Sequence, residues 1–366
     1  MKEEIRCFGC GAIIQNKDIN KIGYVPKLNN NKQHILCQRC FKLQHYHQLQ
    51  QTNLTADDYL NILQEISKKD ALIIYIVDLF DFNGSMIQGI QRHLMGKDLI
   101  IVGNKRDLLP KSCNETKITH WIYRQLKEYG IKPLNVLITS AKKNYHLDSL
   151  MDLIDTHRKN RDVYVVGTTN VGKSTLINAF LKAYASEIDL PLITTSEFPG
   201  TTLDLIEIPL DENHALYDSP GIMNHHQITH MLNPKDLKIV IPSVEVKQQI
   251  YQLNAKQTLY VGGLARLDFI EGEKTSFAGF FSNNLKIHRC KLENADKNYI
   301  NDQITTPKAN NAKKLENLKK HDFFIPEGKH DIVISGLGWF SLKGTRQHIR
   351  VFAPDGVGVF IRQSLI

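Results

Sequence analysis

The chain has 366 residues, of which 42% are hydrophobic and 23% charged, and its formal net charge is +8. This length allows two or three domains, each with a core of its own. No apolar run approaches the roughly 18 to 20 residues of a membrane span, and the start Met1-Lys2-Glu3-Glu4 is unlike a signal peptide. We therefore expect an intracellular, cytoplasmic protein without a membrane partner.

The charge is distributed unevenly along the chain. Residues 1–60 carry 8 basic and 5 acidic groups, residues 61–222 carry 18 and 20, and residues 223–366 carry 20 and 13. Basic flanks fit binding to a polyanion such as RNA, but a solvated surface that aids solubility explains the same charges. Charge alone leaves both interpretations open.

Residues 1–48 contain two short cysteine pairs, Cys7-x-x-Cys10 and Cys37-x-x-Cys40, with 26 residues between them. In a reducing compartment this spacing predicts a tetrahedral zinc site rather than disulfides. We expect a small zinc module that depends on the metal for much of its folding free energy. Alternative ligands are nearby histidines: His34, His45 and His47.

From about residue 55, apolar runs alternate with amphipathic segments, which predicts an α/β domain over residues 55–222. Ligands of such domains collect at the carboxyl ends of the strands. Strands are expected at 71–78, 99–103, 136–139, 163–166, 203–209 and 214–217, and helices at 119–129, 147–157 and 173–185.

A base-reading motif, Asn104-Lys105-Arg106-Asp107, follows the second of these strands. The Asp107 carboxylate can accept two N–H bonds from guanine, whereas adenine has no such donors and would leave a buried anion unpaired. Such a site rejects the wrong base by about 10⁴-fold. We expect Asn104 to brace the loop and Lys105 to cover the base plane.

A second base-reading motif, Thr139-Ser140-Ala141-Lys142, follows the third strand. We expect the backbone at Ser140 and Ala141 to donate to the guanine carbonyl, with Lys142 in the same loop.

A phosphate-binding loop, Gly167-x-x-x-x-Gly172-Lys173-Ser174, lies between a predicted strand and a predicted helix. Its amides and the helix N-terminus cradle phosphate oxygens, Lys173 reaches the terminal phosphates, and Ser174 ligates magnesium. The other nucleotide-binding residues expected here are Thr169, Asn170, Val171 and Thr175.

Two further motifs, Pro199-Gly200-Thr201-Thr202 and Asp218-Ser219-Pro220-Gly221, follow the phosphate loop. We expect Asp218 to reach magnesium through water, the Gly221 amide to meet the terminal phosphate, and Thr202 to close over the metal, with Thr201 as the alternative. Ile222 stands after Gly221 and its aliphatic side chain cannot orient a water. Hydrolysis is therefore expected to be slow or to depend on a further group, in addition to the expected catalytic residues Lys173 and Thr202.

Asn170 is a candidate for that further group. Its amide oxygen could help to hold a monovalent cation, such as potassium, between the phosphates. An equally good explanation is a loop residue that tolerates an unusual backbone angle.

Residues 223–366 show short β-like runs and no catalytic motif. We expect a helical or irregular stretch to about residue 256 and then a separate, basic α+β domain with a flexible polar insertion at 293–322. The expected strands are 258–261, 265–270, 277–281, 286–290, 331–334, 348–352 and 357–361.

The order of the motifs is rotated. In a Ras-like GTPase the phosphate loop comes first, whereas here the base-reading motifs precede it, which indicates a circularly permuted GTPase. Together with the four cysteines and the basic C-terminal part, the chain resembles the YqeH family of circularly permuted GTPases. The resemblance implies a role in assembling the small ribosomal subunit and potassium-stimulated GTP hydrolysis, with Asn170 as the potassium ligand. The implied partners are the small subunit or its precursor, ribosomal RNA and ribosomal proteins.

Two other functions remain open from the sequence. One is a GTP-using RNA-modification factor. The absence of a second catalytic motif in the sequence argues against it. The other is a GTP-gated RNA-binding module without hydrolysis, which differs from a GTPase only in measurable turnover.

Overall fold

The computed structural model describes residues 5–7, 13–17, 23–26, 35–38, 41, 56–87, 89–184, 194–197, 204–299, 307–309 and 317–366. The chain divides into two compact units. The first comprises Met1–Asp78, Ser85–Arg106 and Ile122–Met223, and the second Leu79–Gly84, Asp107–Trp121 and Asn224–Ile366. No helix in the described ranges is long and apolar enough to cross a membrane.

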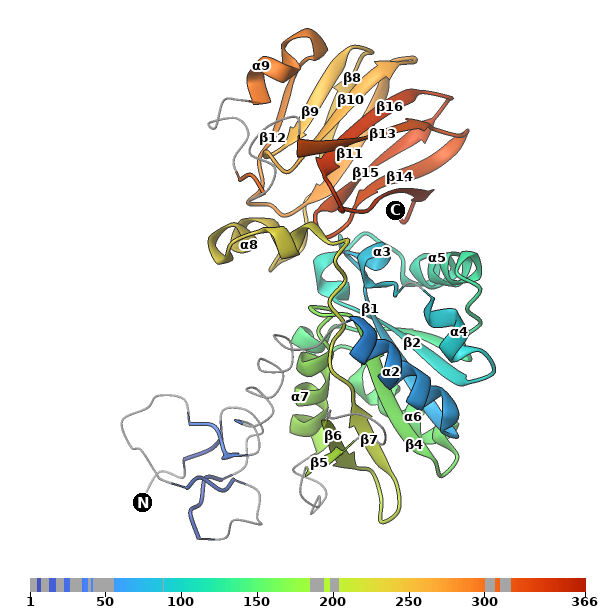
Figure 1. Ribbon diagram of the computed structural model, residues 1–366, viewed down its shortest axis with the longest axis vertical. Coiled ribbons are helices and arrows are strands. Elements are labelled where there is room, and N and C mark those ends of the chain that lie inside the picture. Colours follow the sequence, from blue (N-terminus) through green and yellow to red (C-terminus); the bar gives the residue numbers. More distant parts are fainter. Residues whose placement is uncertain are drawn as a thin grey trace. The chain divides into compact units, whose positions relative to one another are not determined.

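The first unit is built on a mixed sheet in the order β3-β2-β1-β4-β7-β6-β5 (Figure 1). The pairs β1–β2, β1–β4, β2–β3 and β4–β7 are parallel, while β6 is antiparallel to both β5 and β7. The strands are β1 (Ala71–Asp78), β2 (Asp98–Asn104), β3 (Asn135–Ile138), β4 (Asp162–Gly167), β5 (Thr194–Glu197), β6 (Asp204–Pro209) and β7 (Ala215–Asp218).

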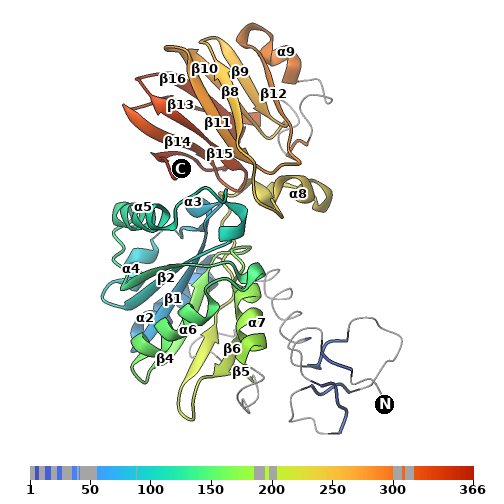
Figure 2. The same ribbon diagram turned by 180° about the vertical axis from the view of Figure 1, so that it is seen from behind.

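Helices cover both faces of this sheet, with α2 on one face and α6 on the other (Figures 1 and 2). Alternate residues of β1 point to opposite faces and are all buried, so both faces form core. On the α6 side, apolar residues of β1, β2 and β4 pack with those of α6 and α7. The helices described up to residue 184 are α2 (Ala56–Lys68), α3 (Phe82–Ser85), α4 (Ile90–Leu94), α5 (Glu115–Glu128), α6 (Leu147–Arg158) and α7 (Lys173–Tyr184), with the 3₁₀ turns η1 (Arg106–Leu108) and η2 (Ala141–Lys143). Most of α3 and η1 and the first half of α5 belong to the second unit.

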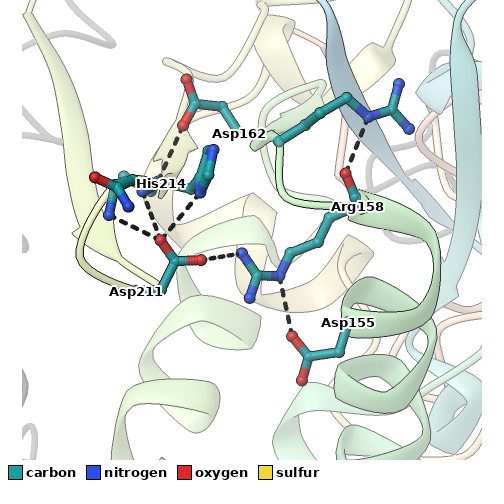
Figure 3. Close-up of polar contacts among 8 residues, drawn as sticks. Asp155, Arg158, Asp162, Asp211 and His214 are labelled. Atoms are coloured by element: carbon teal, nitrogen blue, oxygen red, sulfur yellow. Dashed lines mark hydrogen bonds and ion pairs between the residues drawn. The ribbon is translucent and has the colours of Figure 1, made fainter.

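The connection from α6 to β4 is held by a polar network at the end of the sheet where β4 begins (Figure 3). Arg158 bonds Asp211 in the β6–β7 hairpin at 2.5 Å and Asp155 at 3.1 Å. The hydrogen bond from Arg158 lowers the pKa of Asp211 well below its usual range. The end of α6 is thereby fixed to the neighbouring hairpin.

In the second unit, residues 224–366 form two antiparallel sheets, ordered β12-β9-β10-β16-β13 and β17-β14-β15-β11-β8. Their inner faces share one apolar core. The elements are η3 (Ile228–Met231), α8 (Pro234–Val240), β8 (Gln249–Leu253), β9 (Gln257–Val261), β10 (Ala265–Glu271), β11 (Thr275–Phe281), β12 (Ile287–Lys291), η4 (Leu292–Asn294), α9 (Ala295–Tyr299), β13 (Leu318–Phe324), β14 (Gly328–Ile334), β15 (Gly338–Gly344), β16 (His348–Pro354) and β17 (Val359–Gln363).

Residues 224–366 contain more β-structure than the predicted α+β domain, and three of their strands were not predicted. β8 lies in the stretch expected to be helical or irregular, and β15 begins and ends with glycine. The expected flexible insertion is wrong at both ends, because α9 occupies 295–299 and β13 begins at residue 318. β13 is a lysine-bearing strand at the end of its sheet, and polar edge strands lack the apolar alternation that reveals a strand in sequence.

Candidate functional site

The parallel strands of the first unit bring three predicted motifs to one edge of the sheet. Asp78 at the end of β1 lies opposite Asn104 at the end of β2, and Ile76 lies opposite Gly167 at the end of β4. Val165 of β4 in turn lies opposite Asp218 of β7. The base-reading and phosphate-binding residues, distant in sequence, therefore leave the sheet side by side.

The side chain of Asn104 connects the first base-reading loop, to which it belongs, with the second base-reading loop and the phosphate loop. Its Nδ2 donates to the Val171 carbonyl of the phosphate loop at 2.8 Å. Its Oδ1 accepts from the Ala141 amide at 3.0 Å and from the Thr139 hydroxyl at 3.4 Å. Asn104 is buried, so these bonds satisfy polar atoms that water does not reach. The expected brace is present, and it reaches the phosphate loop as well as the second base-reading loop.

Lys105 forms an ion pair that the sequence did not predict. Its Nζ lies 2.7 Å from Asp78 Oδ2, and both side chains are largely buried. Lys105 also has a φ of 65°, a left-handed conformation that is uncommon outside glycine. The ion pair therefore helps to fix the lysine that should cover the base plane. The one sequence signal was a carboxylate at the end of an otherwise apolar strand next to β2.

Gly172 allows the phosphate loop and the base-reading loop to approach closely. Its φ is 89°, and a Cβ added there would lie 2.4 Å from Asn104 Nδ2. Any side chain at this position would clash with the amide that joins the loops, so the second glycine of the phosphate motif is required by packing as well as by backbone angle.

Lys173 and Asp218 form a buried ion pair, with 2.5 Å between Lys173 Nζ and Asp218 Oδ1 and side chains 5% and 0% exposed. Each is predicted to face a ligand group of opposite charge: phosphate for the lysine, and hydrated magnesium for the carboxylate. In this structure each supplies the countercharge of the other, which keeps two buried charges compensated. A magnesium nucleotide fits this pair, because its phosphates and metal can replace both partners.

The segment after Asp218 is attached to the phosphate loop through backbone groups. The Thr169 amide donates to the Ile222 carbonyl at 2.6 Å, and the Ile222 amide donates to the Gly167 carbonyl at 3.2 Å. Ile222 therefore bonds the phosphate loop through its main chain. Its side chain is aliphatic and forms no hydrogen bond.

The remaining predicted residues are placed as follows. Asp107 lies in η1, the 3₁₀ turn after Asn104 and Lys105, and Ser140 accepts from the Lys143 amide at the start of η2. Thr201 and Thr202 lie outside the described residues. Asn170, Thr175 and Lys142 are exposed, and Ser174 is partly buried at the start of α7.

Only part of the predicted zinc module is described. Cys7 and Cys37 are buried, and the Cys37 amide donates a hydrogen bond to the Cys7 Sγ at 3.2 Å, which brings one cysteine of each pair together. Cys10 and Cys40 lie outside the described residues. No group of three or more metal-binding side chains is found in the described ranges, which hold only two of these four cysteines.

Comparison with known proteins identifies the family of the chain. The YqeH-like C-terminal family model matches residues 274–365, and that of the 50S ribosome-binding GTPases matches residues 162–261. The YqeH protein of Bacillus subtilis is 47% identical over 367 residues, covering 100% of both chains. The chain belongs to the YqeH family of circularly permuted GTPases. It is accordingly a GTP hydrolase that binds GTP and GDP with magnesium.

More distant relatives also match over nearly the whole chain. The NO-associated protein 1 of Arabidopsis thaliana is 28% identical over 98% of this chain and 76% of that protein. The human nitric oxide-associated protein 1 is 22% identical over 99% of this chain and 75% of that protein. Among solved structures, GNP-bound YlqF from T. maritima is 20% identical, with a TM-score of 0.30 over 44% of this chain and 57% of that one.

The Asp78–Lys105 ion pair leads to a testable prediction. Asp78→Asn removes the countercharge of Lys105, so the lysine is held less firmly and GDP affinity should fall roughly fivefold, about 1 kcal/mol. Titration with a fluorescent GDP analogue measures this change.

Asp98→Asn is the matched control. It removes a carboxylate that pairs with Arg161 at the start of β2, the strand that ends just before Lys105. GDP affinity should be unchanged in this control, and native affinity in Asp78→Asn would show that the ion pair has no role in binding.

Proposed function

We propose that this GTPase acts in the cytoplasm in assembly of the small ribosomal subunit, and that its nucleotide state controls binding to ribosomal RNA or ribosomal proteins. The observation that carries the proposal is the combination of a guanine nucleotide site with a basic C-terminal β unit in one chain. The match of residues 162–261 to the family model of the 50S ribosome-binding GTPases supports a ribosomal partner in general, since 50S is the large subunit. The choice of the small subunit rests on the resemblance to the YqeH family, to which the chain belongs. We also propose the division into residues 1–48, 55–222 and 223–366.

The C-terminal sheets offer a surface suited to RNA. Phe324 of β13 is 71% exposed and stacks on His348 of β16, with 4.6 Å between ring centroids. Lys320 and Arg350 lie on the same face, where both interact with Asp322. Exposed aromatic rings beside cations bind unstacked bases and their phosphates. We call Lys320, Phe324, His348 and Arg350 the aromatic-basic patch.

Asp322, the acidic residue that contacts this patch, stays ionised. Burial opposes the charge on Asp322, but hydrogen bonds from Arg350, His348 and Lys320 lower its pKa to about 2. It therefore orients Arg350 and His348 across the neutral pH range. Many other basic side chains of this part of the chain are exposed, including Lys274, Lys286, Arg289, Lys319, Lys329, Lys343 and Arg346.

The contacts within the second unit support control by nucleotide. Asn224 comes three residues after Gly221, and its Nδ2 donates to the Gly84 carbonyl at 2.8 Å. Gln227 Nε2 donates to Asp81 Oδ2 at 2.8 Å. We call residues 79–84 the junction segment. The chain that leaves the magnesium-binding motif is thus bonded to the chain that leaves β1, and a movement of either is passed to the second unit.

The junction segment is also fixed to the C-terminal sheets. Asn83 Oδ1 accepts from Arg362 Nη1 at 2.7 Å, and Phe80 packs against Trp339 with 5.5 Å between ring centroids. The Arg362 guanidinium lies 4.8 Å from the ring centroid of Trp121 and 5.4 Å from that of Trp339. These contacts supply a continuous physical link between the residues after Gly221 and the C-terminal sheets.

Co-sedimentation with purified ribosomal subunits tests the function. The full chain should bind the small subunit with a non-hydrolysable GTP analogue and much less with GDP, and binding should weaken steeply with salt because phosphate contacts release counterions. A double change, Lys320→Ala with Phe324→Ala, should lower binding about tenfold or more without changing nucleotide affinity.

Lys274→Ala is the control for this double change, because it removes an exposed charge from the turn before β11. Binding to the large subunit alone would overturn the small-subunit assignment. Equal binding in both nucleotide states would overturn control by nucleotide, and native binding by the double variant would exclude the aromatic-basic patch.

We further propose that potassium assists hydrolysis through Asn170. This residue is exposed in the phosphate loop and has a φ of 65°, which fits a cation ligand and equally a strained loop residue. Potassium should accelerate hydrolysis relative to sodium in the native protein, and Asn170→Ala should remove the difference while GDP affinity stays largely intact. Identical native rates in the two salts would rule out this role.

We propose one zinc ion per chain, bound by Cys7, Cys10, Cys37 and Cys40. The buried Cys7–Cys37 contact supports this ligand set. Metal analysis should show loss of the zinc in a variant carrying Cys37→Ser and Cys40→Ser, while nucleotide binding remains. Zinc retained by that variant would place the ligands elsewhere.

A further inference from the structure

Two consecutive hydroxyl groups of the phosphate loop are buried without a hydrogen-bond partner among the described residues. Thr168 is 1% exposed and Thr169 is 6% exposed, and neither Oγ1 meets a partner there. A buried hydroxyl that makes no hydrogen bond is unfavourable by about 1–3 kcal/mol. At a ligand site, such a group is a candidate to bond the ligand or a water brought in with it.

Thr169 lies against the segment that is predicted to sense the terminal phosphate. Its amide bonds the Ile222 carbonyl at 2.6 Å. A Cβ built on Gly221 would lie 3.4 Å from both Cα and Cγ2 of Thr169. Gly221 is the residue whose amide should meet the terminal phosphate, so the Thr169 side chain stands beside the position of that group.

Thr168 has a different position. It forms a parallel bridge with Ile222, whereas Thr169 begins the turn of the phosphate loop. The two threonines therefore face different surroundings, and Thr169 is the one in contact with Gly221. Its hydroxyl can donate one hydrogen bond and accept another, a combination that the aliphatic side chain of Ile222 lacks.

We propose that the Thr169 hydroxyl orients the attacking water and contacts the transferred phosphoryl group during GTP hydrolysis. The hydroxyl accepts a hydrogen bond from the water and donates one to a γ-phosphate oxygen. The water oxygen forms a bond to the γ-phosphorus, and the bond to the bridging oxygen breaks with its electron pair left on GDP. The proton lost by the water goes to the released phosphate, so the threonine is unchanged after turnover.

This role rests on the GTPase function and is tested with matched variants of the full chain. Thr169→Val keeps the shape and removes the hydroxyl, Thr169→Ser keeps the hydroxyl, and Thr168→Val removes the other buried hydroxyl. Single-turnover hydrolysis should fall about 100-fold in Thr169→Val, recover to within about tenfold of native in Thr169→Ser, and stay within about twofold of native in Thr168→Val.

Affinity provides a second readout that does not depend on turnover. Thr169→Val should weaken binding of a non-hydrolysable GTP analogue by about fivefold while GDP affinity is unchanged, because the hydroxyl meets only the terminal phosphate. A parallel loss of GDP affinity would indicate a distorted loop and overturn the proposal. Native hydrolysis by Thr169→Val would overturn it too, whereas a native protein without any hydrolysis would instead overturn the GTPase function.

Discussion

The nucleotide site depends on the side-chain amide of Asn104, which bonds the phosphate loop through Val171 and the second base-reading loop through Ala141 and Thr139. A buried amide that loses one of these partners leaves an unsatisfied group in a dry environment. The three loops are therefore held in one arrangement, whichever comes first along the chain. This constraint explains why the rotated order of motifs is compatible with the same site: the strands and the amide define it, and the connections between them do not.

The candidate nucleotide-binding residues could be located from the sequence because the chemistry of such a site restricts both residue type and spacing. Asn104 and Asp218 end β2 and β7, and Gly172 and Lys173 lie in the loop and at the helix start that follow β4, as the sequence predicted. Asp78 was missed as a site residue, because a carboxylate after an apolar strand has no motif of its own and its pairing with Lys105 is a tertiary contact. The ion pair between Lys173 and Asp218 was also not predicted, because the sequence analysis assigned each residue to a ligand group and not to the other residue.

The C-terminal sheets were predicted less well, and β13 shows why. Its residues, Leu-Lys-Lys-His-Asp-Phe-Phe, have no regular alternation because the strand lies at a sheet edge, where only part of one face is covered. Strands in the middle of these sheets, such as β10 and β16, were found because core packing on one face imposes the alternation. The aromatic-basic patch spans β13 and β16, so it becomes visible only when their register brings Phe324 opposite His348.

The circular permutation determines which residues follow the 218–221 motif and bond to the junction segment. In the rotated order the predicted magnesium-binding motif, residues 218–221, ends the nucleotide-binding part of the chain, and Asn224 and Gln227 come shortly after it. Both donate to residues 79–84, which themselves follow Asp78, the partner of Lys105. The second unit is therefore connected by the chain to residues at both the phosphate and the base ends of the site. Linkage is reciprocal in such an arrangement: if nucleotide changes the affinity of the C-terminal sheets for a partner, that partner changes the affinity for nucleotide by the same factor.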